Sequence, residues 1–250
     1  MGETIAVLAF SGPKRAGKSE LARMISEKLN IERGRVADVE FSDPIIEATN
    51  SAATEARELV EDPRAYEKFR NYMVKHATQL VGEDEKSAPS AEAMHTHERR
   101  ADQDCPECDM KNWYDETRAG TELSRENKAE HRAPLVWLGV ALRDTHGPRV
   151  WGEEVGRRVE RAMEAGSKLV TVGGVRSPED VAAIGEHSNL FVVKVIRGED
   201  ADRDATNQRR HQIKPDCVVH NKGTLEDLEI IAGLMADDLV GGGLKPEYGV

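Results

Sequence analysis

Residues 4–29 read TIAVLAFSGPKRAGKSELARMISEKL, and this stretch decides the fold. Its first seven residues form a continuous apolar run, which predicts a strand buried on both faces, as in a parallel sheet. A glycine-rich segment follows, and then Leu21, Ile25 and Leu29 recur at helical spacing. The stretch therefore predicts a buried strand, a tight turn and an amphipathic helix in immediate succession.

The turn matches the phosphate-loop pattern G-x-x-x-x-G-K-[ST] in full, in the strand-to-helix context that the pattern requires. Glycines let successive backbone N–H groups turn inward around a polyphosphate, and the helix N-terminus adds its dipole. Lys18 is expected to reach the β and γ oxygens, and Ser19 to place its hydroxyl on Mg²⁺. The loop consists of Gly12, Pro13, Lys14, Arg15, Ala16, Gly17, Lys18 and Ser19.

Strand patterns recur along the chain at 36–41, 168–175, 189–196 and 216–221, and helical patterns separate them. This alternation predicts an α/β fold of three layers, α/β/α, around a central parallel sheet of five strands. Residues 1–250 are expected to form one phosphate-loop domain, with 241–250 as a loose tail. Asp43 is expected to cap a helix that begins at Pro44.

Two further helix starts are marked by capping residues. Ser177 is expected to cap one helix, and Thr224 and Asp227 have the spacing of a capping box at another. These two helices follow the strand patterns at 168–175 and 216–221, so they belong to the predicted sheet domain.

Residues 83–132 are charged, poor in aliphatic side chains and without apolar periodicity. They predict an insertion that is disordered or held by something other than a hydrophobic core. Four soft ligands within fourteen positions indicate a structural Zn²⁺ site, with His131 or His76 as substitutes for one histidine. A redox pair and unligated thiols are the alternatives. The four ligands are His95, His97, Cys105 and Cys108.

The 250 residues include 35 Lys and Arg against 46 Asp and Glu, a formal net charge of −11. This balance argues against a broad electrostatic grip on nucleic acid. No apolar run approaches the roughly 18 residues of a membrane span, and the N-terminus does not resemble a signal peptide. Three cysteines cannot all pair, which fits a reducing compartment. We expect a cytoplasmic protein with small-molecule substrates; the oligomeric state stays open, with a homodimer as one option.

A phosphate loop alone does not separate kinases from GTPases and motors. The chain contains no N-K-x-D motif for guanine, and the strand at 168–173 continues as GVR without an acidic residue at its tip. The small size and the scattered arginines favour a small-molecule kinase.

Several stretches outside the insertion resemble one family. Residues 10–19 look like its S-G-x-K-R-x-G-K start, 41–45 like its "ADPLK"-type segment, and 221–228 like its N-D-G-[ST]-x-E-E-L ending. Residues 138–151 are similar to its helix pair ending R-x-W, while 175–176 and 195–197 are weaker matches. In these stretches the sequence resembles the bacteriophage deoxynucleoside monophosphate kinases, within the wider adenylate kinase and dephospho-CoA kinase group.

The resemblance implies transfer of the γ-phosphoryl group of ATP to a deoxynucleoside monophosphate, in the host cytoplasm if the protein is viral. It implies that Lys18 holds the ATP phosphates and that Arg149 and Arg176 clamp the phosphate of the acceptor. Each of these arginines is as well explained by a surface salt bridge. Arg143 is a weaker candidate. Arg197 would be the first residue of a lid at 197–215 and could fold over the transferring group. The other arginines of the lid fit a solvated charge run better.

The resemblance also places Asn221 to Gly223 near the adenine, through backbone contacts. One departure concerns Gly174, which stands where the family has an Asp before the Arg, so that a metal- or sugar-binding carboxylate is missing. Asp43 either substitutes through the water shell of the metal or only caps its helix. The lid also lacks a family-type H-x-[ST]-E.

Two other functions remain open on the sequence. One is a dephospho-CoA kinase or another small-molecule phosphate-loop kinase. The other is a catalytically inactive nucleotide-binding regulatory protein, which Gly174 favours and the Lys18-Ser19 pair opposes.

Overall fold

The computed structural model describes residues 5–13, 15–57, 62–82, 106–117, 121–197 and 209–249. Backbone contacts divide the chain into two compact units. The first, here called the sheet unit, comprises Met1–Phe41 and Val155–Val250; the second, the helical unit, is Ser42–Glu154. The sequence suggested one domain with an insertion at 83–132, whereas the helical unit already begins at Ser42.

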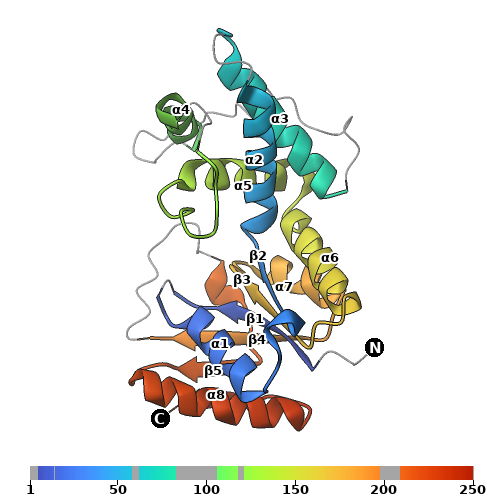
Figure 1. The fold of residues 1–250 in the computed structure, drawn as a ribbon, viewed down its shortest axis with the longest axis vertical. Coiled ribbons are helices and arrows are strands. Elements are labelled where there is room, and N and C mark those ends of the chain that lie inside the picture. The colour runs from blue at the N-terminus through green and yellow to red at the C-terminus, as the bar shows by residue number, and fades with distance from the viewer. Residues whose placement is uncertain are drawn as a thin grey trace. The chain divides into compact units, whose positions relative to one another are not determined.

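The sheet unit is built on one parallel sheet (Figure 1), in the strand order β2-β3-β1-β4-β5-β6. The α/β class and the parallel sheet are therefore confirmed. β1 is buried at every position, as its continuous apolar run predicts, and it lies inside the sheet between β3 and β4. The strands are β1 (Ala6–Ser11), β2 (Val36–Glu40), β3 (Leu169–Gly173), β4 (Leu190–Ile196), β5 (Cys217–His220) and β6 (Glu247–Gly249).

The sixth strand corrects two expectations, the count of five strands and the loose tail. β6 pairs with β5 in parallel, with Tyr248 opposite Val219. Tyr248 is only 4% exposed, and its hydroxyl donates to Asp238 Oδ2 at 2.6 Å and accepts from the Lys245 amide at 2.9 Å. One buried aromatic residue, Tyr248, anchors this strand. A single buried side chain gives no alternating apolar pattern, so the sequence did not predict a strand here.

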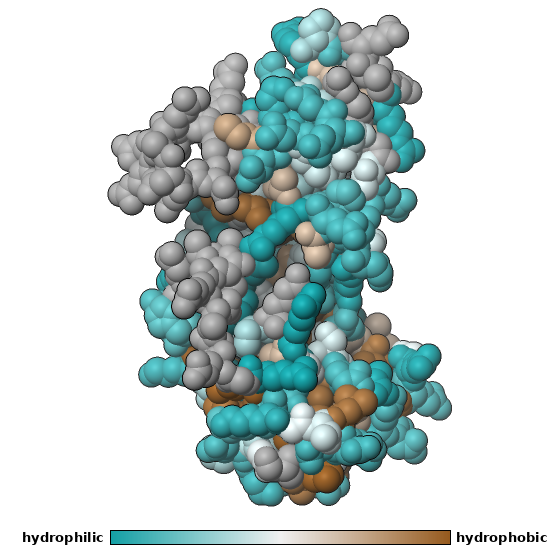
Figure 2. Space-filling view, turned by 90° about the vertical axis from the view of Figure 1, so that its left-hand side faces the viewer, coloured by the Kyte–Doolittle hydropathy of each residue, from teal (hydrophilic) through white to brown (hydrophobic). Residues whose placement is uncertain are grey.

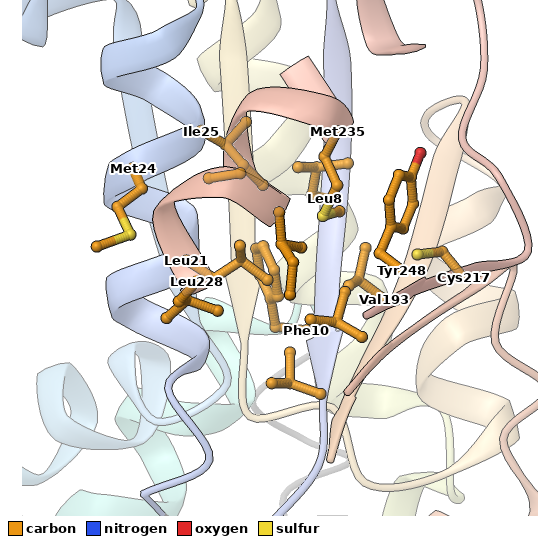
Figure 3. Close-up of a cluster of buried hydrophobic side chains, with 14 of the residues drawn as sticks. Leu8, Phe10, Leu21, Met24, Ile25, Val193, Cys217, Leu228, Met235 and Tyr248 are labelled. Carbon is orange, nitrogen blue, oxygen red and sulfur yellow. The ribbon is translucent and has the colours of Figure 1, made fainter. Parts of the chain in front are cut away.

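The helices of the sheet unit are α1 (Lys18–Lys28), α7 (Pro178–Gly185), α8 (Leu225–Val240) and the later part of α6 (Val150–Glu164). Helices α1 and α8 pack together on one face of the sheet, where Leu8 and Phe10 of β1 meet Leu21, Leu228 and Met235 (Figure 3). The intervening residues Val7 and Ala9 are also buried, so the opposite face is covered too. Helix α7 contacts β4. This arrangement is compatible with three layers.

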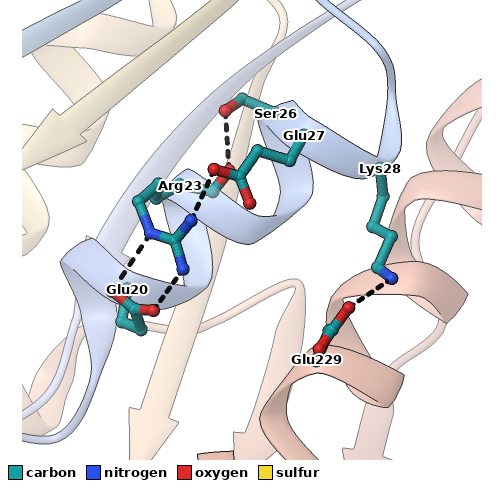
Figure 4. A network of polar contacts seen from close by, with 6 residues as sticks. All are labelled: Glu20, Arg23, Ser26, Glu27, Lys28 and Glu229. Carbon is teal, nitrogen blue, oxygen red and sulfur yellow. Dashed lines mark hydrogen bonds and ion pairs between the residues drawn. The ribbon is translucent and has the colours of Figure 1, made fainter. Parts of the chain in front are cut away.

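The outer face of α1 carries a polar network (Figure 4). Arg23 binds Glu20 and Glu27 of the same helix, each at 2.5 Å, and Lys28 reaches Glu229 of α8 at 2.7 Å. The Arg23 guanidinium lowers the pKa of the Glu20 carboxyl, and Lys28 does the same for Glu229. Exposed pairs of this kind contribute little free energy, so the core fixes the helix that follows the phosphate loop.

The capping predictions in the sheet unit are confirmed. The Thr224 hydroxyl accepts from the Asp227 amide while the Asp227 carboxylate accepts from the Thr224 amide, which starts α8. Ser177 and Asp180 form the same reciprocal pair at α7. These bonds satisfy N–H groups that the first turn of a helix leaves without intrahelical partners.

The helical unit contains α2 (Asp43–Ala56), α3 (Ala65–Leu80), α4 (Pro106–Thr117), α5 (Arg132–His146) and the start of α6. Helix α4 lies inside the predicted insertion, yet Met110, Trp113 and Tyr114 are buried. Trp113 stacks on Phe69 of α3, with ring centroids 6.1 Å apart. The expectation that no hydrophobic core holds 83–132 is therefore wrong for α4, whose short stripe is aromatic rather than aliphatic.

No helix in the described ranges is long and apolar enough to cross a membrane. Among the coloured residues in Figure 2, hydrophilic ones predominate, with apolar residues in smaller areas between them. This surface is in keeping with the high proportion of charged residues, 32% of the chain.

Candidate functional site

The phosphate loop follows β1 at the carboxyl edge of the sheet. Strand β1 leads to β2 on one side of itself, while the adjacent strand β4 leads to β5 on the other. Open parallel sheets bind ligands outside the carboxyl ends of their strands at such a point, where neighbouring connections leave in opposite directions. The motif and the topology therefore indicate the same location.

Gly12 makes the first turn of the loop. Its φ is +129°, and a Cβ atom there would lie 2.1 Å from the carbonyl oxygen of Val195 in β4. A backbone oxygen of a buried strand cannot move aside, so only glycine is compatible with this position. The glycine that the motif requires thus has a structural cause, the close approach of the loop to β4.

Gly17 makes the second turn and precedes α1 as its N-cap, with φ +96°. A Cβ atom there would lie 2.6 Å from Nδ2 of Asn221. This Nδ2 atom donates to the Ala16 carbonyl oxygen at 2.8 Å, and the Asn221 amide donates to Ile196 O at 2.8 Å. Asn221, which the resemblance places near adenine, is therefore a direct support of the loop.

Lys18 turns back over the start of the loop. Its Nζ donates to the carbonyl oxygens of Gly12, at 3.0 Å, and Pro13, at 2.5 Å. Arg15 is exposed with φ +64°, and Ser19 is exposed in the first turn of α1. The loop thus combines a held ammonium group with a helix N-terminus, a combination suited to an anion. Lys14 lies outside the described residues.

Arg176 and Arg197 lie in the sheet unit with the loop. Arg176 follows β3 and Arg197 follows β4 directly, so both lie near the same edge of the sheet as the loop. Both are exposed, and the backbone amide of Arg176 donates to Asp180. Guanidinium groups carry a positive charge and bind phosphate groups well.

The predicted lid is described only at Arg197 and at 209–215. Arg209 forms an ion pair with Glu179 of α7. The backbone amide of Glu179 itself and the Arg209 guanidinium lower the pKa of the Glu179 carboxyl. Arg209, for which the sequence favoured a solvated charge run, is therefore engaged in a surface ion pair.

Gly223 has a role in starting α8. A Cβ atom there would lie 2.1 Å from Oδ2 of Asp227, the oxygen that closes the capping box on Thr224. The segment between β5 and α8 therefore uses Asn221 to hold the loop and Gly223 to admit the cap.

The other predicted substrate residues, Asp43, Arg143 and Arg149, belong to the helical unit. Asp43 does not cap its helix, since Ser42 occupies the N-cap position without a side-chain cap. Arg125 holds the Asp43 carboxylate from two sides, Nε to Oδ1 at 2.8 Å and NH2 to Oδ2 at 2.5 Å. The expectation of a capping Asp43 is wrong because this arginine engages both carboxylate oxygens.

Arg149 lies 3.4 Å from Glu153, one turn further along the chain, which is the surface-pair geometry considered from the sequence. Arg143 lies in the last turn of α5. Trp151, at the end of the segment matched to R-x-W, is buried and donates from Nε1 to Gly139 O at 3.1 Å. The tryptophan therefore joins α6 to α5.

The predicted zinc ligands His95, His97 and Cys105 lie outside the described residues. Cys108 is exposed on α4. His76 Nε2 lies 2.7 Å from Glu55, and His131 Nδ1 accepts from Trp113 at 3.2 Å, so both proposed substitutes have partners. Within the described parts of the chain, no group of three or more His, Cys, Asp or Glu is placed to hold a metal ion.

One carboxylate at the sheet edge was missed by the sequence reasoning. Glu40, the last residue of β2, is in register with Gly173, the last residue of β3. A Cβ atom on Gly173 would lie 3.5 Å from Oε1 of Glu40. The alternating pattern of residues 36–41 showed a strand end there, but not that its neighbour would be a glycine.

No protein-family model matches this sequence, and no curated protein is significantly similar to it. The functional argument therefore depends on the residues and the geometry described above.

Proposed function

We propose that this protein is a nucleotide kinase that transfers the γ-phosphoryl group of ATP to a nucleoside or deoxynucleoside monophosphate. The observation that carries the proposal is the construction of the loop. A buried strand leads into two glycines at positive φ, and Lys18 and Asn221 hold the loop by hydrogen bonds. A backbone shaped in this way at the start of a helix favours a polyphosphate.

In the proposed reaction, an oxygen of the acceptor phosphate forms a bond to the γ-phosphorus as the bond to the β–γ bridging oxygen breaks. The products are ADP and a nucleoside diphosphate. Lys18 and the loop amides bind the ATP phosphates, and Ser19 offers its hydroxyl to Mg²⁺. Bound Mg²⁺ would neutralise the charge on the phosphate oxygens.

The acceptor side of the proposal uses the arginines. Arg176 and Arg149 bind the acceptor phosphate, with Arg143 and Asp43 as further substrate residues, and Arg197 closes over the transferring group. The segment from Asn221 to Gly223 lies beside the adenine and contacts it through backbone atoms. Such groups act by positioning and by charge neutralisation, which phosphoryl transfer requires more than covalent chemistry.

The test is an ADP-release assay with ATP, Mg²⁺ and a panel of deoxynucleoside monophosphates, nucleoside monophosphates and dephospho-CoA. Lys18→Ala should lower kcat/KM at least about 100-fold, because the held charge is removed from the transition state. Lys28→Ala is the matched control, a lysine at the other end of the same helix whose partner is Glu229.

The acceptor distinguishes the candidate functions. Turnover with a monophosphate supports the proposal, while turnover with dephospho-CoA alone would replace it by that kinase activity. Binding of ATP without turnover of any acceptor would support a regulatory protein. Full activity of Lys18→Ala would remove the phosphate loop from the mechanism.

A further inference from the structure

The tip of β3 has no carboxylate of its own, because Gly173 ends the strand and Gly174 follows it. In Gly174 the backbone has φ +83°, and a Cβ atom would lie 3.4 Å from the Cβ of Phe41. A side chain is strained at such a φ, so this backbone disfavours an acidic residue there. A phosphate-loop enzyme nevertheless needs a group that positions the Mg²⁺ of its nucleotide.

Glu40 brings a carboxylate to this point from the neighbouring strand. In parallel strands, residues in register point to the same face, so Glu40 shares the face of Gly173. The Cγ and Oε1 atoms of Glu40 lie 3.2 Å and 3.5 Å from where the Cβ of Gly173 would be. The Glu40 side chain therefore lies in close contact with the point from which a side chain at the end of β3 would start.

This face is also the face of α1. The pairing of β1 with β3 places Leu8 in register with Thr171. Gly173 comes two residues after Thr171, so it points to the same face of the sheet as Leu8 and Phe10. These two β1 residues pack against α1, the helix that begins with Lys18 and Ser19. Strand β3 lies between β2 and β1, and neighbouring strands are about 4.8 Å apart. Gly173, which the Glu40 side chain contacts, is thus about one strand spacing from β1.

We propose, on the basis of the proposed kinase function, that Glu40 is the metal-positioning residue of this site. Its carboxylate would accept hydrogen bonds from water ligands of the Mg²⁺ that accompanies ATP, and Ser19 would offer its hydroxyl to the same ion. Mg²⁺ keeps several water ligands and needs only one or two carboxylates in addition to the phosphates, so one glutamate is sufficient.

The two other acidic residues nearby in the sequence do not fit this role. Asp43 belongs to the helical unit and not to the sheet unit that carries the loop. Asp38 precedes Glu40 by two residues and lies about 7 Å further from the carboxyl edge. Asp38 shares the strand and the face of Glu40 and is therefore a matched control.

The experiment measures Mn²⁺ binding to the complex of the full chain with ATP, without an acceptor, by the electron paramagnetic resonance signal of free Mn²⁺. For Glu40→Gln we expect the Kd for Mn²⁺ to rise about 10-fold or more, and the Mg²⁺ concentration for half-maximal activity to rise with it. ATP binding in the presence of EDTA should not change. Asp38→Asn should bind Mn²⁺ as the wild type does.

A relocation variant separates metal positioning from a structural role. Glu40→Ala combined with Gly173→Asp removes the glutamate that contacts this position and places a carboxylate directly on β3. We expect this pair to recover most of the Mn²⁺ affinity that Glu40→Ala alone loses. A purely structural Glu40 would not be replaced by a charge on another strand.

The outcomes for the two proposals differ. Wild-type protein that does not bind ATP would overturn both. Wild-type protein that turns over ATP, with Glu40→Gln binding Mn²⁺ as tightly as Asp38→Asn, would overturn only the role of Glu40. Failure of the relocation variant to bind Mn²⁺ better than Glu40→Ala would also overturn this role.

Discussion

Nδ2 of Asn221 donates a hydrogen bond to the carbonyl oxygen of Ala16 at 2.8 Å, across 205 positions of sequence. The bond joins the end of β5 to the phosphate loop, and the Asn221 amide is itself bound to Ile196 at the end of β4. The shape of the loop therefore depends on a residue that the motif does not contain.

Replacement of Asn221 by Leu should weaken both the fold and the nucleotide site. The side chain is 6% exposed, so the substitution leaves a buried carbonyl without its donor, at a cost of about 1–3 kcal/mol. The KM for ATP should rise as the loop loses its support. Urea denaturation and ATP titration measure the two effects. Lys222→Ala, an exposed neighbour, should change neither, and an unchanged Asn221→Leu protein would contradict the prediction.

Gly12→Ala tests the close approach of the loop to β4. The added Cβ would clash with a backbone oxygen, and the φ of +129° is strained for alanine, so we expect a loss of about 2–4 kcal/mol and of ATP binding. Gly34→Ala is the control, because nothing lies within 4 Å of its Cβ position. Thermal unfolding should show no loss of stability for this control. Equal effects of the two substitutions would mean that the contact with Val195 has no energetic role.

The residues at the centre of the fold were predictable from the sequence. The run before Gly12 is apolar at every position because β1 lies between two strands and two layers, and such burial leaves a direct trace in composition. The sequence patterns of strand β6 and helix α4 are weaker, because few of their residues are apolar. Tyr248 alone anchors the first, and Met110, Trp113 and Tyr114 anchor the second, within segments that are otherwise charged.

The candidate site divides in the same way. The glycines and Lys18 could be predicted from a short sequence motif, because their spacing along the chain sets their geometry. The hydrogen bond from Asn221 and the position of Glu40 above Gly173 depend on strand order and register, which no local pattern contains. The pairing of Arg125 with Asp43 likewise joins residues 82 positions apart.

Tyr248→Phe tests how β6 is held. The substitution keeps the buried ring but removes the hydroxyl that binds Asp238 and the Lys245 amide, so we expect a loss of about 1 kcal/mol. Amide hydrogen exchange in 247–249 should become faster, with little change in β1. Tyr248→Ala should cost about 3 kcal/mol or more, because it also leaves a cavity. If exchange in β6 is already as fast as in an unfolded peptide, the strand is not stably paired.

The zinc prediction remains open to a direct measurement. Protein purified without a histidine tag and kept reduced should contain about one Zn²⁺ per chain. Chelation should then make Cys105 and Cys108 react with an alkylating reagent, whereas buried Cys217 should react slowly with or without metal. Absence of zinc from freshly prepared protein, with equal reactivity before and after chelation, would exclude the site.

The stability of the sheet unit should fall at alkaline pH because of Cys217. Burial raises the pKa of this thiol to about 12, so the folded protein keeps a proton that the unfolded chain releases near pH 8.5. The contribution of the protonated thiol to the stability of the folded protein is complete below about pH 8.5 and is lost as the pH rises towards 12. Between pH 8.5 and 10.5 the free energy of unfolding should decrease by roughly 2 kcal/mol for this reason.

Cys217→Val provides the control, since valine fills a similar volume without an ionisable group. Burial and the bond to Asp238 also raise the pKa of Tyr248, so both proteins should lose stability at still higher pH. The difference between them isolates the thiol. Urea midpoints at pH 7.5, 8.5, 9.5 and 10.5 measure it, and the wild type should have the steeper decline. Parallel declines would mean that Cys217 ionises as readily in the folded protein as in the unfolded chain, and that the α1–α8 face of the sheet admits water.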